Sequence, residues 1–355
     1  MRTLAIESSC DETAAAVIEN GTTIISNVVS TSKEMHEKYG GIVPEVAARM
    51  QLDYIIPVIT EALAPFYGGE KPSLLRMIND NIDTIAIAVG PGLIGSLLVG
   101  VETAKTIAMV TGKPIIPVNH VLAHMYANFV VTKQSNEIQF PAISLVVSGG
   151  HTELYLMQSP NTLTWLGGTL DDAAGECFDK TARLLGFGHG GGVSIQEAAK
   201  KFQQADALAD PIRLPRPMLD HDNEFNFSFS GLKTAILREV NTCKTNNRLT
   251  EETIRYMSHE VQETITDVLV KKTLHAAQKH NAQSILLSGG VSANLRLREK
   301  FQEALTNEHI SLHVPPVSLC TDNAVYIGAY AYFQGTPEHW GSIIASPNLS
   351  VEVSS

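Results

Sequence analysis

The stretch TLAIESSCDETAAAVIENGTTIISNVV (residues 3–29) decides the fold. Its first apolar run predicts a strand, which ends in the small polar turn SSCD and is followed by a second strand. Asn20-Gly21 is a strong hairpin signal, so the residues after it are predicted to form a third strand. The same order of strand, tight polar turn, strand, turn and strand recurs over residues 142–166, which indicates a duplicated α/β unit.

Each copy is predicted to close with a strand, a glycine turn and a helix. In the first copy the turn is Gly90-Pro91-Gly92 and the helix begins near Ser96; in the second the turn is Ser288-Gly289-Gly290 and the helix begins near Ser292. Amphipathic stretches at 44–65 and 250–280 predict helices between the strands. Glycine turns at the carboxyl ends of strands favour a nucleotide in a cleft between two lobes, although such glycines can also serve only to permit tight turns.

The segment GPGLIG (90–95) matches the dinucleotide-binding pattern GxGxxG. That motif needs an acidic residue at the end of the next strand to bind the ribose, but the strand 114–118 ends in Asn119-His120. Proline in the loop also removes a backbone donor. We therefore disfavour a nicotinamide cofactor.

His120 and His124 are four residues apart at the start of a predicted helix. This spacing places both imidazoles on one helical face, where they can hold a metal if a third ligand joins them. Taken alone, a histidine pair at this spacing is more often solvated or satisfied within the core than bound to a metal. The rest of the chain decides between these interpretations.

Composition restricts the remaining possibilities. Hydrophobic residues make up 44% and charged residues 18% of the 355-residue chain, which is typical of a globular protein. The net charge is −11, so bulk charge provides no nucleic-acid-binding surface, and a local patch or a partner would have to supply one. The four cysteines form no CxxC pair, which favours reduced thiols. No signal peptide or long apolar run is evident, so we expect a cytoplasmic protein without membrane association.

The chain resembles the TsaD (Gcp) family of tRNA threonylcarbamoyladenosine transferases. The resemblance rests on collinear motifs: IESSCDETAAAV (6–17), YGGIVPEVAAR (39–49), GPGLIGSLLVG (90–100), NHVLAH (119–124), VVSGGHTEL (146–154), LDDAAGECFDKTARLLG (170–186), NFSFSGLKT (226–234), LSGGVSANLRLR (287–298) and CTDNA (320–324). It implies the ASKHA fold of actin, hexokinase and DnaK, with two duplicated ribonuclease-H-like lobes and an interlobe cleft. We expect an N-terminal lobe at 1–135 and a C-terminal lobe at 136–355. The second lobe carries an insertion at about 188–248, and its last helix could pack back on the first lobe.

The resemblance implies transfer of a threonylcarbamoyl group from threonylcarbamoyl-AMP to N6 of adenosine 37 in tRNAs that read ANN codons, with release of AMP. By correspondence with the family, the metal ligands are His120, His124 and Asp322. The family carries one divalent metal ion; two histidines and a carboxylate suit iron or zinc, and we expect iron first.

The resemblance also implies residues that bind the donor nucleotide: Val146, Val147, Ser148, Gly149, Gly150, Asp179, Gly192 and Asn294. Taken alone, Asp179 could form a helix salt bridge and Asn294 could cap the following helix. Asp11 and Glu12 are candidates for a base that accepts the N6 proton, or they only shape their loop.

The sequence departs from the family pattern at three places. Residues 121–123 replace the Met-Glu-Gly found between the two histidines in bacterial members, Gln51 replaces a histidine, and HGGGV (189–193) replaces YPGGP. Without the Glu of HExxH, a metalloprotease is disfavoured. A small-molecule kinase or ATPase of the ASKHA type is the main alternative, but it would not need the histidines. A scaffold that has lost catalysis would be expected to lack some of the ligands.

The partners implied by the resemblance are tRNA and either a TsaB-like paralogue with a TsaE-like ATPase, as in bacteria, or subunits of the KEOPS type. The motifs VPE (43–45) and FDKTARLLG (178–186) resemble those of bacterial members and favour the bacterial set of partners.

Overall fold

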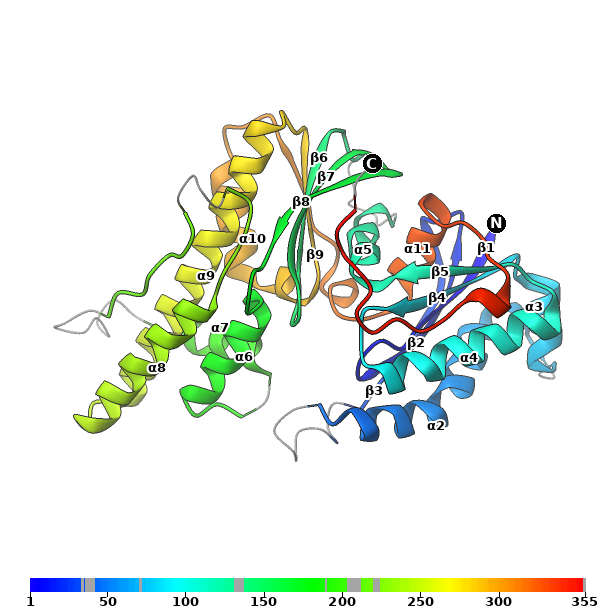
Figure 1. The fold of residues 1–355 in the computed structure, drawn as a ribbon, viewed down its shortest axis with the longest axis horizontal. Coiled ribbons are helices and arrows are strands. Elements are labelled where there is room, and N and C mark those ends of the chain that lie inside the picture. The colour runs from blue at the N-terminus through cyan, green and yellow to red at the C-terminus, as the bar shows by residue number, and fades with distance from the viewer. Residues whose placement is uncertain are drawn as a thin grey trace. The chain divides into compact units, whose positions relative to one another are not determined.

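The computed structural model describes residues 1–32, 35, 42–69, 72–130, 137–188, 190–202, 212–219 and 224–353. The chain divides into two compact units (Figure 1). The first comprises Met1–Glu137 and Pro315–Val353, and the second comprises Ile138–Val314. The sequence had placed everything after residue 135 in the second lobe, with the last helix able to pack back. The structure instead groups the whole segment from Pro315 with the first unit, because helix α11 and the residues after it pack on the first sheet.

The first unit contains a five-stranded sheet in the order β3-β2-β1-β4-β5. Its strands are β1 (Arg2–Glu7), β2 (Glu12–Glu19), β3 (Thr23–Thr31), β4 (Thr84–Gly90) and β5 (Ile115–Asn119). The first three are antiparallel, whereas β4 runs parallel to β1 and β5 runs parallel to β4. The predicted hairpin is present, with positive φ angles at Asn20 and Gly21. Strand pairing therefore follows the pattern expected from residues 3–29.

Helices cover both faces of this sheet. The elements are α2 (Pro44–Ala62), η1 (Ala64–Phe66), α3 (Leu74–Asn81), α4 (Ile94–Thr111), α5 (His120–Ala123), η2 (His124–Phe129), η6 (Val317–Leu319), α11 (Val325–Phe333) and η7 (Trp340–Ser342). Leu4 and Ile6 pack in one core with residues of α2 and α4, while Ala5 between them faces Gly328 of α11. Since alternate residues of a strand point to opposite faces, α11 lies on the face opposite α2 and α4.

Helix α4 is long and apolar enough to cross a membrane by length and composition alone. Seven of its residues, among them Leu97, Val101 and Ala104, are buried within the first unit, and α4 packs on β4 and α2. A core helix of an α/β layer has the same composition, so the segment is explained by its packing.

The second unit repeats the first in its sheet, with the order β10-β9-β6-β7-β8. Its strands are β6 (Ala142–Val147), β7 (Thr152–Ser159), β8 (Thr162–Gly168), β9 (Ser284–Ser288) and β10 (Ser311–His313). Strands β6, β7 and β8 are antiparallel, and β9 and β10 extend the sheet in parallel from β6. Read from β8, this is the order and direction of β3-β2-β1-β4-β5, so the predicted duplication is confirmed.

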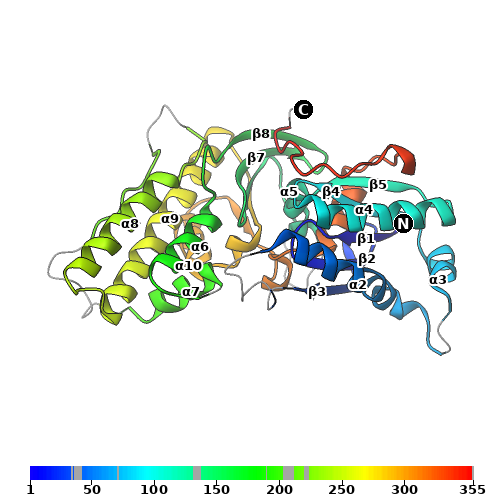
Figure 2. The same cartoon turned by 60° about the horizontal axis from the view of Figure 1, so that its bottom comes forward.

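The helices of the second unit are α6 (Ala174–Leu184), α7 (Gly191–Lys200), α8 (Ser230–Thr245), α9 (Glu251–Lys279), η5 (Gly290–Ala293) and α10 (Leu295–Leu305). The long helix α9 packs against α7 and α10 (Figure 2) and contributes Val261, Ile265 and Leu269 to the core. Helices α7 and α8 fall within the predicted insertion at 188–248; of that insertion, residues 189, 203–211 and 220–223 lie outside the described part.

The C-terminal segment that follows α11 (residues 334–353), called the strap below, runs over the first unit. The Glu338 amide donates to Ile115 O at 2.9 Å, and the Ser346 amide donates to Val89 O at 2.7 Å. Ile343 is buried in the core around β1 and β4. A Cβ on Gly90 would lie 1.9 Å from Ser346 O, so the glycine at this position makes room for the strap.

Candidate functional site

A hydrogen-bonded cap starts the short helix that carries both histidines. Asn119, the last residue of β5, accepts from the amides of Val121 and Leu122 through Oδ1 at 3.0 and 3.2 Å. Its side-chain amide donates to Ser350 O of the strap at 2.8 Å. Asparagine is a preferred N-cap because its oxygen satisfies otherwise unpaired helix donors. The cap and the strap therefore fix the point at which His120 leaves the sheet.

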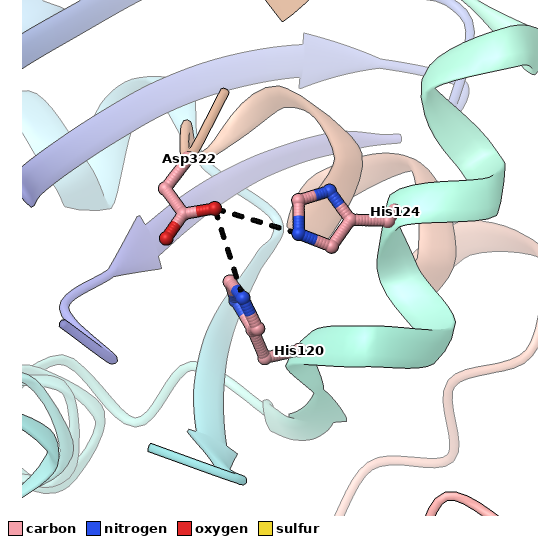
Figure 3. A group of neighbouring side chains, drawn as sticks. All are labelled: His120, His124 and Asp322. Atoms are coloured by element: carbon pink, nitrogen blue, oxygen red, sulfur yellow. Dashed lines mark ion pairs between the residues drawn. The ribbon is translucent and has the colours of Figure 1, made fainter. Parts of the chain in front are cut away.

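His120, His124 and Asp322 converge within the first unit (Figure 3). Asp322 lies between η6 and α11, and its Oδ1 is 3.7 Å from His120 Nε2 and 3.4 Å from His124 Nε2. The two imidazole centroids are 4.8 Å apart. Both histidines are buried, whereas the Asp322 side chain keeps 24% of its surface exposed. The structure thus brings together the three residues that the resemblance named as metal ligands.

The donor set fits a divalent metal. Among the described residues, Nδ1 of buried His124 has no hydrogen-bond partner and Nε2 faces Asp322 Oδ1 at 3.4 Å, which is costly for buried polar atoms unless a ligand satisfies them. One ligand atom from each of the three residues lies within 4.8 Å of the others. Two imidazoles and one carboxylate with further positions open are typical of catalytic zinc and non-haem iron sites. The chemistry of these residues does not discriminate between the two metals.

Burial and neighbouring charges shift the pKa values of the three candidate ligands in different directions. Burial works to lower the pKa of His120, but the carboxylates of Glu7 and Asp322 outweigh it and raise the value to about 9. Burial dominates at His124 and lowers its pKa. Burial alone would raise the pKa of Asp322, yet the two histidines hold it well below its usual range. Asp322 is therefore ionised, as a ligand carboxylate must be.

Sequence reasoning missed three residues that support this site. Glu7 Oε2 lies 2.9 Å from His120 Nδ1, and Ser9 Oγ lies 3.2 Å from the same nitrogen. Tyr326 donates its hydroxyl to Asp322 Oδ1 at 3.3 Å, and its ring centroid is 4.4 Å from that of His124. Tyr326 follows Asp322 by one helical turn, which is a signal that the spacing could have provided.

The loop that carries Asp11 and Glu12 lies in the electrostatic field of Asp322. Burial and the charges of Asp322 and Asp11 raise the pKa of Glu12 to about 10. A carboxyl with this pKa is protonated at neutral pH, so Glu12 can act as a base only when positive charge is added beside it. The side-chain amide of Gln51 stabilises this loop by donating to Cys10 O and Glu12 O at 3.0 Å each.

In the second unit the turn Ser148-Gly149-Gly150 follows β6 directly. Val146 and Val147 are buried strand residues, whereas the two glycines are exposed and a Cβ on either would meet open space. The Gly175 amide at the start of α6 donates to Ser148 O at 3.2 Å. The turn is thus anchored on one side and open on the other, which leaves its glycine backbone free to approach a ligand.

Helix α7 carries Gly192 and contacts both Asp179 and Leu295, the residue after Asn294. A Cβ on Gly191 would lie 2.2 Å from Asp179 Oδ1, so the helix start packs closely on Asp179. Gly192 is the second residue of α7, and Gly190, with φ of 80°, is the N-cap before it. Gln196 of the same helix accepts from Leu295 N at 2.8 Å.

Asn294 is the N-cap of α10, one of the two roles that the sequence left open for it. Its Oδ1 accepts from Leu297 N at 3.0 Å, and its side-chain amide donates to Gln262 at 3.1 Å. Both polar atoms are therefore engaged, which means that a ligand contact would have to share one of these bonds or replace it. Asp179 lies on α6 and is exposed.

Comparison with known proteins agrees with this arrangement. Residues 23–329 match the family model TsaD, described as tRNA N6-adenosine threonylcarbamoyltransferase. The chain belongs to the TsaD family. Proteins named tRNA N6-adenosine threonylcarbamoyltransferase from Persephonella marina and Shouchella clausii are each 45% identical to it, over 94% and 93% of this chain and 90% and 92% of theirs. The matched range spans parts of both units and contains the positions of all three candidate metal ligands.

Solved structures show the ASKHA fold expected for this TsaD family member. HypF from T. kodakarensis superposes with a TM-score of 0.58 at 13% identity, covering 92% of this chain and 46% of that one. Component A of (R)-2-hydroxyglutaryl-CoA dehydratase from Acidaminococcus fermentans gives a TM-score of 0.51 at 13% identity, covering 94% and 98%. At these identities the likeness concerns the fold alone.

Proposed function

We propose that this protein transfers the threonylcarbamoyl group from threonylcarbamoyl-AMP to N6 of adenosine 37 in tRNAs reading ANN codons. The N6 nitrogen attacks the carbamoyl carbon, a C–N bond forms, the C–O bond to the phosphate of AMP breaks, and one proton leaves N6. The observation that carries the proposal is the group of two buried imidazoles and a half-buried carboxylate in a chain that matches named transferases over almost its whole length.

The donor nucleotide is assigned to the second unit. The open turn 148–150 offers backbone amides to the phosphate, with Val146 and Val147 behind it. Asp179 accepts hydrogen bonds from the ribose hydroxyls, and Gly192 lets the start of α7 approach the nucleoside. Asn294 shares its side-chain amide between Gln262 and the ligand. These roles follow the family motifs and are supported by the contacts that link the residues.

His120, His124 and Asp322 would hold one divalent ion, for which we favour iron over zinc. When bound, the ion supplies a Lewis acid for oxygens of the threonylcarbamoyl group. Asp322 contributes the anionic ligand, and Tyr326 fixes its carboxylate orientation. Asp11 and Glu12 are assigned to removal of the N6 proton, for which positive charge near Asp322 must first lower the pKa of Glu12.

We further propose that the protein works in the cytoplasm with partner proteins, a TsaB-like paralogue and a TsaE-like ATPase. The net charge of −11 supports a contribution from partners to tRNA binding, since an acidic subunit attracts few phosphates by itself. Cysteines without disulfides agree with a reducing compartment.

A single-turnover assay tests the function. Threonylcarbamoyl-AMP and an ANN-decoding tRNA are mixed with the protein, iron and the partner proteins, and the nucleosides are analysed by mass spectrometry. We expect modified adenosine with the native protein and none with His124→Ala. The matched control is His313→Ala, which removes another buried histidine, on β10 in the second unit. Absence of product from the native protein would refute the proposal, and phosphorylation of a small sugar or polyol by this protein alone would favour the kinase class.

A further inference from the structure

Glu7 is a buried carboxylate in contact with a candidate metal ligand. It ends β1, its side chain is 1% exposed, and its Oε2 lies 2.9 Å from His120 Nδ1. Its other oxygen accepts from the Ser9 amide at 2.5 Å. Both oxygens are therefore committed to donors on the protein, and the carboxylate has one defined orientation.

This orientation determines which nitrogen of His120 carries hydrogen. An ionised carboxylate can only accept, so Nδ1 must donate to Glu7. The lone pair of the neutral ring then resides on Nε2, the nitrogen that faces Asp322 at 3.7 Å. Nε2 is also the atom that must be unprotonated to bind a metal.

Charge supports the same interpretation. Within the described part of the chain, no lysine or arginine forms an ion pair with Glu7 or Asp322. Two carboxylates with no lysine or arginine beside them are costly to place together in a largely buried site. A divalent ion between His120, His124 and Asp322 would balance both charges.

We propose that Glu7 is the positioning residue of this site: it holds His120 in the tautomer and orientation in which Nε2 can bind the metal. Carboxylates that accept from ligand histidines commonly have this effect on metal affinity. The inference rests on the metal site of the proposed function. A purely structural role for Glu7, holding the loop through the Ser9 amide, is the alternative that the experiment must separate.

The decisive variant is Glu7→Gln. The Ser9 amide requires an acceptor, so the glutamine oxygen faces Ser9 and its NH2 group faces His120 Nδ1. That donor forces the ring proton onto Nε2, which blocks the metal ligand without changing the volume of the side chain. Glu260→Gln is the control, because it neutralises a carboxylate of similar size that is paired with Arg216 in the second unit.

Binding of Co²⁺ to the full-length, metal-stripped protein is measured by its visible absorption and by competition with a chelator, without tRNA or donor. We expect the Kd of Glu7→Gln to rise about 10- to 100-fold, with a changed spectrum, while Glu260→Gln binds as the native protein does. The melting temperature of the metal-free variants provides the structural readout. Glu7→Asp, which keeps the charge on a shorter side chain, is expected to bind with intermediate affinity.

Unchanged Co²⁺ affinity in Glu7→Gln, with or without a lower melting temperature, would overturn the proposal and leave only the structural role. If Glu7→Gln does not fold, Glu7→Asp carries the test, and native affinity in that variant overturns it. Failure of the native protein to bind Co²⁺ also overturns it, whereas the transfer assay decides separately on the proposed function.

Discussion

Replacement of Asn119 tests how the start of α5 is stabilised. Asn119→Ala removes the cap on Val121 and Leu122 and also the hydrogen bond to Ser350 O. Loss of an N-cap costs about 1 kcal/mol, and loss of one further hydrogen bond costs about 1 kcal/mol. We therefore expect the free energy of unfolding of the first unit to fall by about 2 kcal/mol.

Asn119→Asp separates the two contributions. The carboxylate keeps an acceptor for the helix amides but has no donor for Ser350 O, so we expect about half of the loss. Urea unfolding is followed by tryptophan fluorescence. The chain has two tryptophans, Trp165 and Trp340, and a Trp165→Phe background leaves Trp340 of the strap to report on the first unit.

Two results would refute this reasoning. A loss below about 0.5 kcal/mol for Asn119→Ala would mean that neither contact matters, since substitutions without a structural role fall in that range. Equal losses for Asn119→Ala and Asn119→Asp would assign the whole effect to the strap and none to the cap. Co²⁺ affinity measured on the same variants should follow their order of stability, because His120 is the next residue.

Two further predictions concern the candidate metal and nucleotide sites, and a third concerns Asp171, a carboxylate of the second unit that is hydrogen-bonded to Ser228 and Ser230. Gln51→Met, which keeps the volume of the side chain but loses its donor, should destabilise the first unit by about 1–3 kcal/mol in urea unfolding, because the loop carbonyls lose a buried partner; stability equal to the native protein would contradict this. Gly191→Ala should weaken AMP binding in calorimetry, because its Cβ would displace Asp179, whereas Gly231→Ala, which meets no neighbour, should bind AMP normally. Against the effect of burial, hydrogen bonds from serine hydroxyls lower the pKa of Asp171 to about 2; its contribution to stability is therefore present above its unfolded pKa near 4 and lost as the pH falls towards 2. Urea unfolding at pH 5, 4 and 3 should show a smaller acid loss in Asp171→Asn, and an equal loss in both proteins would count against it.

Local sequence patterns were sufficient for the sheets and for part of the site. The hairpin at Asn20-Gly21 and the alternation of apolar runs with polar turns predicted the first three strands of each copy, whereas the short strand β10 was not predicted. The spacing of His120 and His124 predicted one shared helical face, since that geometry depends only on four consecutive residues. Asp322 was reached only through the resemblance to the family, because no local spacing connects it with the histidines.

Non-local contacts account for what was missed. Glu7 and His120 are 113 residues apart in the sequence and meet because β1, β4 and β5 are neighbours in one sheet. The position of the strap could not be predicted from the sequence because the segment has no hydrophobic periodicity. It is held instead by backbone hydrogen bonds to Val89 and Ile115. The glycine turn at 90–92 was interpreted as a loop that binds a ligand. In the structure Gly90 makes room for the strap, and a Cβ on Gly92 would lie only 2.4 Å from Ser9 O, so both glycines are explained by close packing.

The return of the chain to its first unit has a consequence for synthesis on the ribosome. Residues 138–314 form a contiguous unit and can complete their core as soon as they emerge. The first unit, although its sheet is made early, lacks α11 and Ile343 until the residues after Val314 are translated. The first unit is therefore completed after the second, and Asp322 joins the two histidines only after the whole second unit has been translated.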